Sequence, residues 1–289
     1  MVSAAQKSEE QYLQAGYFVT GGINISLLKR KQRGTTQRDK ATLPFMNCKR
    51  KDGALLIGSG ISPIECFFLE ELSGLSQFNP NNIFVIGNAW GWSAVVLANC
   101  FPDSFILSID ACLGGTMKYE GLVASNLVKN QNNLNIQFCE ARSPQDNSSV
   151  IRKYLGESSI NLVFIDAEHT NEAQSNDYAS VAFATNENTV FIFHDVMLFN
   201  MQDSFFSIAK SLPMYKAKIL SRTTSGLGIL YPKRYTEIDS ITDAFCNSMD
   251  SLISLFPKKT KMALLKDLIV KFLPSLITSW LIKVKRKFV

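Results

Sequence analysis

The sequence predicts an α/β fold: a doubly wound, Rossmann-like, seven-stranded mixed sheet, mostly parallel, with a last antiparallel hairpin and with N- and C-terminal helical extensions. Two observations support this fold class. Short apolar runs alternate with helix-forming runs along much of the 289-residue chain. Four of the apolar runs are followed by a glycine or an acid, at Gly87, Asp110, Asp166 and Asp195. Open parallel sheets carry their ligand-binding groups at this end of the strands.

The expected elements follow one another along the chain. A helix over 61–75 is indicated by the spacing of Ile64, Phe67, Phe68 and Leu72. Strands are expected near 82–86, 104–109, 135–138, 161–165 and 189–193, and helices near 92–100, 117–130, 148–156, 172–185 and 202–211. Two further strands, 215–220 and 227–231, form the hairpin, and helices follow from about 237. Right-handed crossovers then place helices on both faces of the sheet.

The most informative segment is the glycine turn after the first of these strands. Residues 82–98 pass from a β-rich apolar run through Gly87 and Gly91 into a helix-forming run that starts at Ser93. The spacing Gly-x-x-x-Gly-x-Ser is not the Gly-x-Gly-x-x-Gly of dinucleotide folds, and it lacks the Lys-Ser/Thr of a P-loop. The turn therefore argues against a pyrophosphate ligand, and an ordinary turn that holds two glycines is the alternative.

Acids and histidines follow the later strands. Asp110 comes 19 residues after the second glycine of the turn, where an acid can accept hydrogen bonds from ribose hydroxyls. Asp166 and His169 follow the fourth strand, and His194 with Asp195 follows the fifth. Both histidines of the chain thus fall in strand-end motifs. A structural imidazole with a satisfied hydrogen bond is the alternative for each.

The order of these motifs resembles that of class I S-adenosylmethionine-dependent methyltransferases. The motifs are Val-Ile-Gly-Asn-Ala-Trp-Gly-Trp-Ser, then Ser-Ile-Asp, Phe-Ile-Asp-Ala-Glu-His-Thr and Phe-His-Asp-Val. The chain is most similar to the catechol O-methyltransferase-like group, which includes small-molecule and macrolide-sugar O-methyltransferases. The resemblance covers about 61–232, and Ser225–Tyr231 is similar to the last antiparallel strand of that sheet. It implies S-adenosylmethionine as cofactor and a hydroxyl of a small molecule or glycoside as methyl acceptor.

The resemblance also implies roles for single residues. The methionine end of the cofactor would be lined by Gly87, Asn88, Ala89, Gly91, Trp92 and Ser93. Asp110 would hold the ribose, and Ala141, Arg142 and Gln145 would edge the adenine. Asp166 would lie beside the cofactor at the reaction centre, where Asp166 and Asp195 would position the acceptor or a metal. His169 stands where catechol-type relatives have a base, and histidine titrates near neutral pH, so His169 is the expected general base.

Two departures from the family pattern leave questions open. The family usually has an acid two positions before the first glycine of the turn, and this chain has Val85. Either Asn88 supplies the polar network there or the cofactor affinity is lower. Metal-binding relatives carry acid-amide or acid-acid pairs where this chain has His194-Asp195, so Asp166, His194 and Asp195 are the candidate metal set. Either His194 faces away, or the metal is softer than Mg²⁺, or no metal is bound.

Other function classes are less consistent with the residues. A dinucleotide-dependent oxidoreductase would need the third glycine and a Tyr-x-x-x-Lys motif, which are absent. A non-catalytic cofactor-binding or membrane-docking protein on the same fold is supported by Val85. Nucleic-acid methylation is disfavoured because residues 53–256 carry eleven Lys/Arg against twenty acids. The expected partner is therefore a small-molecule acceptor.

The ends of the chain differ from its middle. We expect an N-terminal cap over 1–60 that contributes to the acceptor pocket, a methyltransferase domain over 61–235 and a helical extension over 236–289. Residues 257–289 carry nine Lys/Arg against one acid, and 262–289 show a wide apolar helical face with a kink at Pro274. This segment predicts either a helix packed on the body or in a homodimer interface, or an interfacial membrane helix. Six cysteines without paired spacing and no signal peptide favour a cytoplasmic protein, with membrane association as the alternative.

Overall fold

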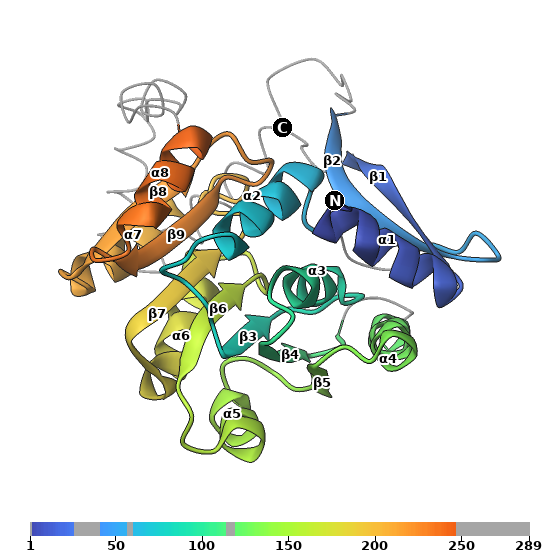
Figure 1. Ribbon diagram of the computed structural model, residues 1–289, viewed down its shortest axis with the longest axis horizontal. Coiled ribbons are helices and arrows are strands. Elements are labelled where there is room, and N and C mark those ends of the chain that lie inside the picture. Colours follow the sequence, from blue (N-terminus) through green and yellow to red (C-terminus); the bar gives the residue numbers. More distant parts are fainter. Residues whose placement is uncertain (1, 26–40, 57–59, 114–118, 247–289) are drawn as a thin grey trace, which may run out of the picture. The chain divides into compact units, whose positions relative to one another are not determined.

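The computed structural model describes residues 2–25, 41–56, 60–113 and 119–246 (Figure 1). Our expectations for the amphipathic segment 262–289 lie outside these residues. Residues 1–247 form one compact unit. Within the described ranges, none of the helices combines the length and the apolar character that crossing a bilayer requires.

Seven strands form one mixed sheet in the order β5-β4-β3-β6-β7-β9-β8. The first five strands run parallel, while β9 pairs antiparallel with both β7 and β8. Their bounds are β3 (Asn82–Ile86), β4 (Phe105–Asp110), β5 (Ile136–Glu140), β6 (Ile160–Ile165), β7 (Thr185–Phe193), β8 (Tyr215–Leu220) and β9 (Leu227–Pro232). The predicted seven-stranded, mostly parallel sheet with a last antiparallel hairpin is confirmed.

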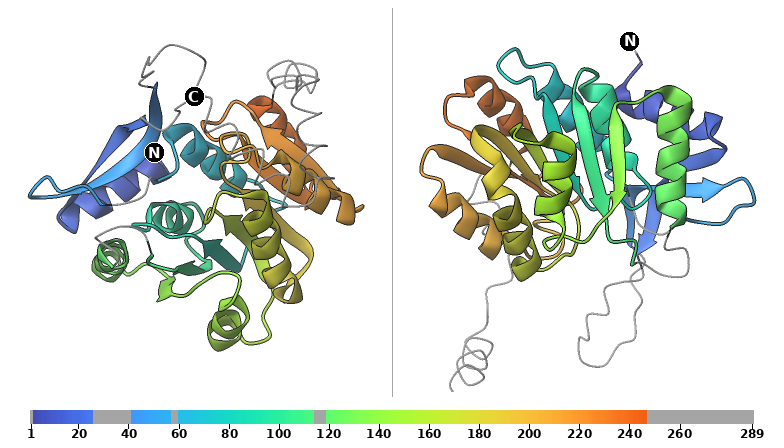
Figure 2. Two further views of the ribbon diagram at one scale, coloured as in Figure 1. Left: turned by 180° about the vertical axis from the view of Figure 1, so that it is seen from behind. Right: turned by 90° about the horizontal axis from the view of Figure 1, so that it is seen from below.

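Helices cover both faces of this sheet (Figure 2). The helices on one face are α2 (Pro63–Ser73), α3 (Trp92–Cys100), α4 (Glu120–Asn132) and α8 (Thr236–Phe245). On the other face lie α5 (Asn147–Leu155), α6 (Asn171–Val181) and α7 (Gln202–Ser211). A 3₁₀ turn, Ala182–Ala184, extends α6 towards β7. This two-sided cover is the doubly wound arrangement that strict alternation predicts.

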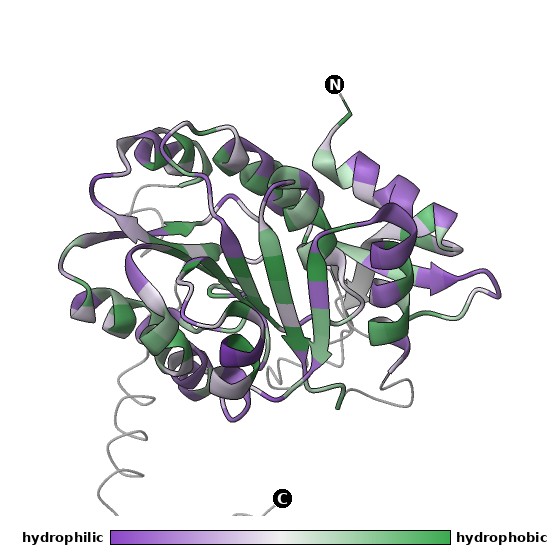
Figure 3. Ribbon diagram, turned by 60° about the horizontal axis from the view of Figure 1, so that its bottom comes forward, coloured by the Kyte–Doolittle hydropathy of each residue, from purple (hydrophilic) through white to green (hydrophobic). Residues whose placement is uncertain are grey.

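The central strand β3 shows why the core has two halves. Ile83 and Val85 belong to the core on the α3 side, and Phe84 and Ile86 belong to the core on the α5 side. Side chains alternate between the faces of a strand, so a strand covered on both faces is a continuous apolar run. The strands in the middle of Figure 3 are accordingly apolar along most of their length.

The N-terminal extension contains more than the predicted helix. Helix α1 (Ala4–Gln14) is followed by an antiparallel pair of strands, β1 (Tyr17–Ile25) and β2 (Ala41–Arg50), which we had not expected. Glycines interrupt β1, and glycine weakens a strand pattern, so the sequence signal of this pair is poor. Helix α1 packs against α3 and α4, and Tyr12 donates a hydrogen bond of 2.6 Å to the Trp90 carbonyl.

Helix α8 also belongs to the compact body, although we expected it to open the C-terminal extension. It packs against α2 and β8. The Phe245 ring meets Phe68 edge-on, with centroids 5.4 Å apart. Tyr231 donates a hydrogen bond of 2.6 Å to Asp239.

The turn after β3 depends on glycine. Gly87 has φ of +92°, and a Cβ built there would overlap the backbone carbonyl of Asp166 at the end of β6. The neighbouring strands β3 and β6 therefore approach each other at their carboxyl ends only because position 87 has no side chain. This approach brings the glycine turn next to Asp166.

We predict that Gly87→Ala destabilises the protein by about 2–4 kcal/mol, because it combines a left-handed backbone with an overlap of backbone atoms. Gly53→Ala is the matched control. Gly53 has φ of +84° but nothing within 4 Å of a built Cβ, so only the conformational cost of about 1 kcal/mol applies. Chemical denaturation measures both. Equal losses of stability would show that the contact with Asp166 is unimportant.

Candidate active site

A pocket of about 420 Å³ lies at the carboxyl ends of the parallel strands. Its walls come from the loops that follow β3, β4, β5, β6 and β7. Eleven of the residues proposed from the sequence line it: Gly87, Asn88, Ala89, Trp92, Ser93, Asp110, Ala141, Arg142, Asp166, His169 and Asp195. The pocket thus brings together the glycine turn, the ribose acid and the proposed reaction centre.

Three proposed residues do not line the pocket: Gly91, Gln145 and His194. A Cβ at Gly91 would meet the side chains of Ser125 and Tyr12, so this glycine lets α3 pack on its neighbours. Gln145 is exposed on the loop after β5. His194 is buried behind the pocket, with 4% of its surface exposed.

The ribose acid is held by the glycine turn. Asp110 Oδ2 accepts hydrogen bonds from the backbone N–H groups of Asn88 and Ala89, at 2.9 and 2.8 Å. Its other oxygen accepts from Cys112 N at 2.7 Å. The carboxylate is thereby fixed at the pocket wall and in turn fixes the loop that the cofactor would contact.

The polar network at the turn bears on the question left open by Val85. Val85 is fully buried in the apolar core. Asn88 lies beside it, and its side chain donates to Ser125 Oγ at 2.9 Å and accepts from Ser108 Oγ at 3.1 Å. Asn88 thus forms the buried polar network that the first alternative requires, and the effect of Val85 on cofactor affinity stays a prediction.

The edge proposed for adenine is formed by Ala141, Arg142 and Ser143. Ser143 was missed because a serine in a loop carries no distinctive pattern. Its hydroxyl donates a hydrogen bond to Asp177 on α6 and accepts one from Asn147 at 2.8 Å. This wall is thus fastened to two helices on the far face of the sheet.

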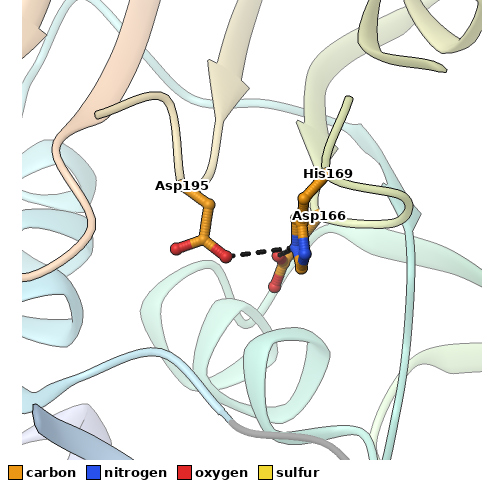
Figure 4. Close-up of side chains that lie close together, drawn as sticks. All are labelled: Asp166, His169 and Asp195. Carbon is orange, nitrogen blue, oxygen red and sulfur yellow. Dashed lines mark ion pairs between the residues drawn. The ribbon is translucent and has the colours of Figure 1, made fainter. Parts of the chain in front are cut away.

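The reaction centre brings together Asp166, His169 and Asp195 (Figure 4). His169 Nε2 lies 3.1 Å from Asp195 Oδ2 and 3.5 Å from Asp166 Oδ1. The ring also stacks on Phe199, with centroids 4.3 Å apart and planes 13° apart. The His169 ring is therefore restrained in two ways. Two carboxylates lie beside its Nε2 atom, and the stacked Phe199 ring restricts the plane of the imidazole.

His194, which we included in the candidate metal set, does not line the pocket, in line with the alternative that it faces away. Its Nε2 lies 3.3 Å from Glu65 Oε2 on α2, and its Nδ1 lies 3.0 Å from Asp166 Oδ1. Each ring nitrogen of His194 thus has a carboxylate oxygen as its near neighbour, so neither nitrogen is free to bind a ligand in the pocket. His169 takes its place in the cluster with Asp166 and Asp195.

The charges of this cluster compensate each other. Burial alone would lower the pKa of His194, but Asp166, Glu65 and Asp195 outweigh it and raise that pKa well above its ordinary value. Burial would raise the pKa of Asp166, yet His194 and His169 lower it to about 2. Burial opposes a raised pKa at His169 as well, and its contacts with Asp166 and Asp195 prevail. The three carboxylates thus favour the protonated form of His194.

Comparison with known families identifies this part of the chain. Residues 84–196 match the sequence model of the methyltransferase domain family. These residues run from β3 to the end of the His194-Asp195 motif and include most of the pocket wall. The matched part of the chain is a methyltransferase domain. The predicted cofactor, S-adenosylmethionine, follows from that assignment, and the match argues against a dinucleotide-dependent oxidoreductase.

Solved structures share the fold of this methyltransferase. An O-methyltransferase from Bacillus cereus in complex with SAH is 17% identical, with a TM-score of 0.48 over 62% of this chain and 84% of that one. A putative caffeoyl-CoA O-methyltransferase from Staphylococcus aureus is 14% identical, with a TM-score of 0.47 over 60% and 84%. A putative O-methyltransferase from Klebsiella pneumoniae is 15% identical, with a TM-score of 0.47 over 79% and 89%. Likenesses this weak say nothing about the acceptor, and no curated protein matches the chain.

The methyltransferase has a donor set that fits a divalent ion. One ligand atom each from Asp166, His169 and Asp195 lies within 4.8 Å of the others. His169 Nε2 and Asp195 Oδ1 are buried and lack a hydrogen bond of good geometry. Two carboxylates and an imidazole suit Mn²⁺, Fe²⁺ or Zn²⁺ better than Mg²⁺. These residues would hold the ion, which would acidify an acceptor hydroxyl.

The N-terminal extension contributes little to the pocket of the methyltransferase in the part that is described. Among residues 2–25, 41–56 and 60, Gly60 alone lines it. The extension instead supports residues of the site from outside the pocket. Tyr12 donates a hydrogen bond to the Trp90 carbonyl, and Phe45 packs on the His194 ring with centroids 5.9 Å apart. The proposed contribution of residues 1–60 to the acceptor pocket stays a prediction.

We predict that Asp110→Asn weakens S-adenosylmethionine binding by about 10-fold or more. Hydrogen bonds to a charged group contribute about 1.5–3 kcal/mol, and about 1.4 kcal/mol is tenfold in affinity. Isothermal titration calorimetry measures the change. Asp103→Asn, at an exposed position before β4, is the control and should keep the wild-type affinity. Equal affinities of the two variants would remove Asp110 from the cofactor site.

Proposed function

We propose that this methyltransferase methylates a hydroxyl oxygen of a small molecule or glycoside, with His169 as the general base. The observation that supports the proposal is the position of His169 Nε2. It lies at the pocket wall between Asp195 and Asp166, at 3.1 and 3.5 Å, with a third of the side chain exposed. A histidine in this setting can accept a proton from a bound hydroxyl and is kept in one orientation.

The chain's residues have separate tasks in this reaction. S-adenosylmethionine, when bound, supplies an electrophilic methyl group. Asp110 and the glycine turn hold the cofactor, and His169 removes the proton of the acceptor hydroxyl. Asp166 and Asp195 orient His169 and stabilise the imidazolium that forms, as a carboxylate partner does in other acid-base sites.

The acceptor side of the pocket has an apolar component. Phe199 stacks on the exposed part of His169 and is itself 45% exposed. Its loop is fastened to α6, because Asn171 Nδ2 donates to the Asn200 carbonyl at 3.2 Å and Gln174 Nε2 donates to the Met201 carbonyl at 3.2 Å. A fixed aromatic ring beside the base supports an acceptor with an apolar or aromatic surface.

Metal-assisted transfer is the second candidate, supported by the cluster of Asp166, His169 and Asp195. A metal bound by His169 is incompatible with His169 acting as the general base. As the base, His169 keeps its Nε2 proton directed at Asp195 and Asp166 and accepts the proton of the acceptor hydroxyl at Nδ1; as a metal ligand, it binds the ion through Nε2 and carries its proton on Nδ1, so it cannot do both. Metal dependence of turnover therefore separates the two candidates.

We predict that His169→Ala lowers turnover by about 10²-fold or more and leaves S-adenosylmethionine affinity unchanged, given the usual contribution of a general base. Formation of S-adenosylhomocysteine with a panel of hydroxylated acceptors, including catechols and glycosides, gives the turnover. Glu172→Gln, at an exposed position in the first turn of α6, is the control. Turnover that survives in His169→Ala would exclude His169 as the base.

We also predict that protein stripped with a chelator keeps its turnover, because the base mechanism needs no ion. Metal content is checked by elemental analysis before the assay. Loss of turnover on chelation and its recovery with Mn²⁺ or Zn²⁺, but not with Mg²⁺, would instead assign His169 as a metal ligand.

A further inference from the structure

The proposed reaction gives no role to a buried carboxylate beside the site, that of Glu65. Glu65, in the first turn of α2, is completely buried. Its Oε2 accepts hydrogen bonds from Ser62 N and Ser62 Oγ, at 2.8 and 2.9 Å. Its Oε1 accepts from Ser225 N and Ser225 Oγ, at 2.9 and 2.5 Å. These contacts tie the start of α2 to the loop between β8 and β9.

The Glu65 carboxylate also contacts a third residue, and this contact is not needed to tie α2 to the β8–β9 loop. Glu65 Oε2 lies 3.3 Å from His194 Nε2. On the other side of the ring, His194 Nδ1 lies 3.0 Å from Asp166 Oδ1 and 3.3 Å from Asp195 Oδ1. A continuous line of charged groups therefore runs from α2 through His194 to both carboxylates of the pocket.

Aromatic side chains pack beside the His194 ring, which is the central group of this line. The His194 ring lies between Phe45 and Phe164, with centroids 5.9 and 6.2 Å away. In such surroundings water screens the contacts little, and a carboxylate oxygen within 3.3 Å of each ring nitrogen restricts the orientation of the imidazole. Asp166 Oδ1 lies 3.0 Å from His194 Nδ1 and 3.5 Å from His169 Nε2, so the position of His194 bears on the oxygen that His169 meets.

We propose that Glu65 is a positioning residue of the methyl-transfer site. It fixes the His194 imidazole, and His194 fixes the carboxylates of Asp166 and Asp195 that orient His169. Glu65 touches neither the pocket nor His169, so it acts only through this line. The inference rests on the proposed role of His169, and it gives α2, which precedes the matched domain in sequence, a part in the reaction centre. Partners behind the groups that touch the substrate or metal commonly orient them in this way.

The chain offers a direct test because it has two histidines. Full-length protein labelled with ¹⁵N-histidine gives two sets of ring signals, which His169→Ala and His194→Gln assign. The spectra are recorded in the presence of a chelator. We expect Glu65→Gln to move the ring signals of His194 and also those of His169, by more than the line width, although Glu65 does not contact His169.

Ser225→Ala is the matched control. It removes one of the bonds that tie Glu65 to the β8–β9 loop and leaves the contact with His194 intact. We expect it to lower the melting temperature by a few degrees and to leave the His169 signals in place. If Glu65 had a structural role alone, Glu65→Gln would behave like Ser225→Ala. It would lower the melting temperature and leave the His169 signals in place.

A third variant keeps the test decisive if Glu65→Gln does not fold. His194→Gln interrupts the line and retains the bonds of Glu65 to Ser62 and Ser225, so it should move the His169 signals as well. Unmoved His169 signals in the folded variants, or an equal movement in Ser225→Ala, would overturn the proposal. Absence of S-adenosylmethionine binding by the wild-type protein would overturn the proposed function instead, and the ring signals would still decide the role of Glu65.

Discussion

Three carboxylates, Glu65, Asp166 and Asp195, are gathered at one end of the sheet with little or no access to solvent, and two imidazoles lie within 3.5 Å of them. Isolated buried carboxylates are costly, and removing one partner of such a group leaves another uncompensated. The remaining features of the site follow from this constraint. His194 is buried between carboxylates of this cluster, and His169 is the imidazole that lines the pocket.

The arrangement separates a binding half of the pocket from a reacting half. On one side, the β3 turn and Asp110 form a rigid wall of backbone N–H groups and a carboxylate, which is suited to hold a polar cofactor. On the other side lies His169, stacked on Phe199, where we propose that the acceptor binds. Gly87 joins the halves, because the turn and the Asp166 backbone can touch only where there is no Cβ.

Much of this could be predicted from the sequence, and the reasons are local. Buried parallel strands are continuous apolar runs, so their ends and the residues that follow, such as Asp110 and Asp166, are visible in the chain. Glu65 was not predicted because an acid in an amphipathic helix resembles a surface residue, and its partner His194 is 129 positions away. The direction of His194 could not be predicted because strand alternation does not say which of two adjacent polar residues turns into a pocket. Here Asp195, with φ of +60°, turns into it.

The central claim is that this pocket binds S-adenosylmethionine through the wall formed by the β3 turn and Asp110. A calorimetric titration of the full-length protein with S-adenosylmethionine, in chelator and again with Mn²⁺, tests it most directly. We expect one saturable site with the same affinity in both conditions, since the wall formed by the β3 turn and Asp110 can hold the cofactor without an ion. Absence of saturable binding in either condition would contradict the claim and favour a non-catalytic protein on the same fold.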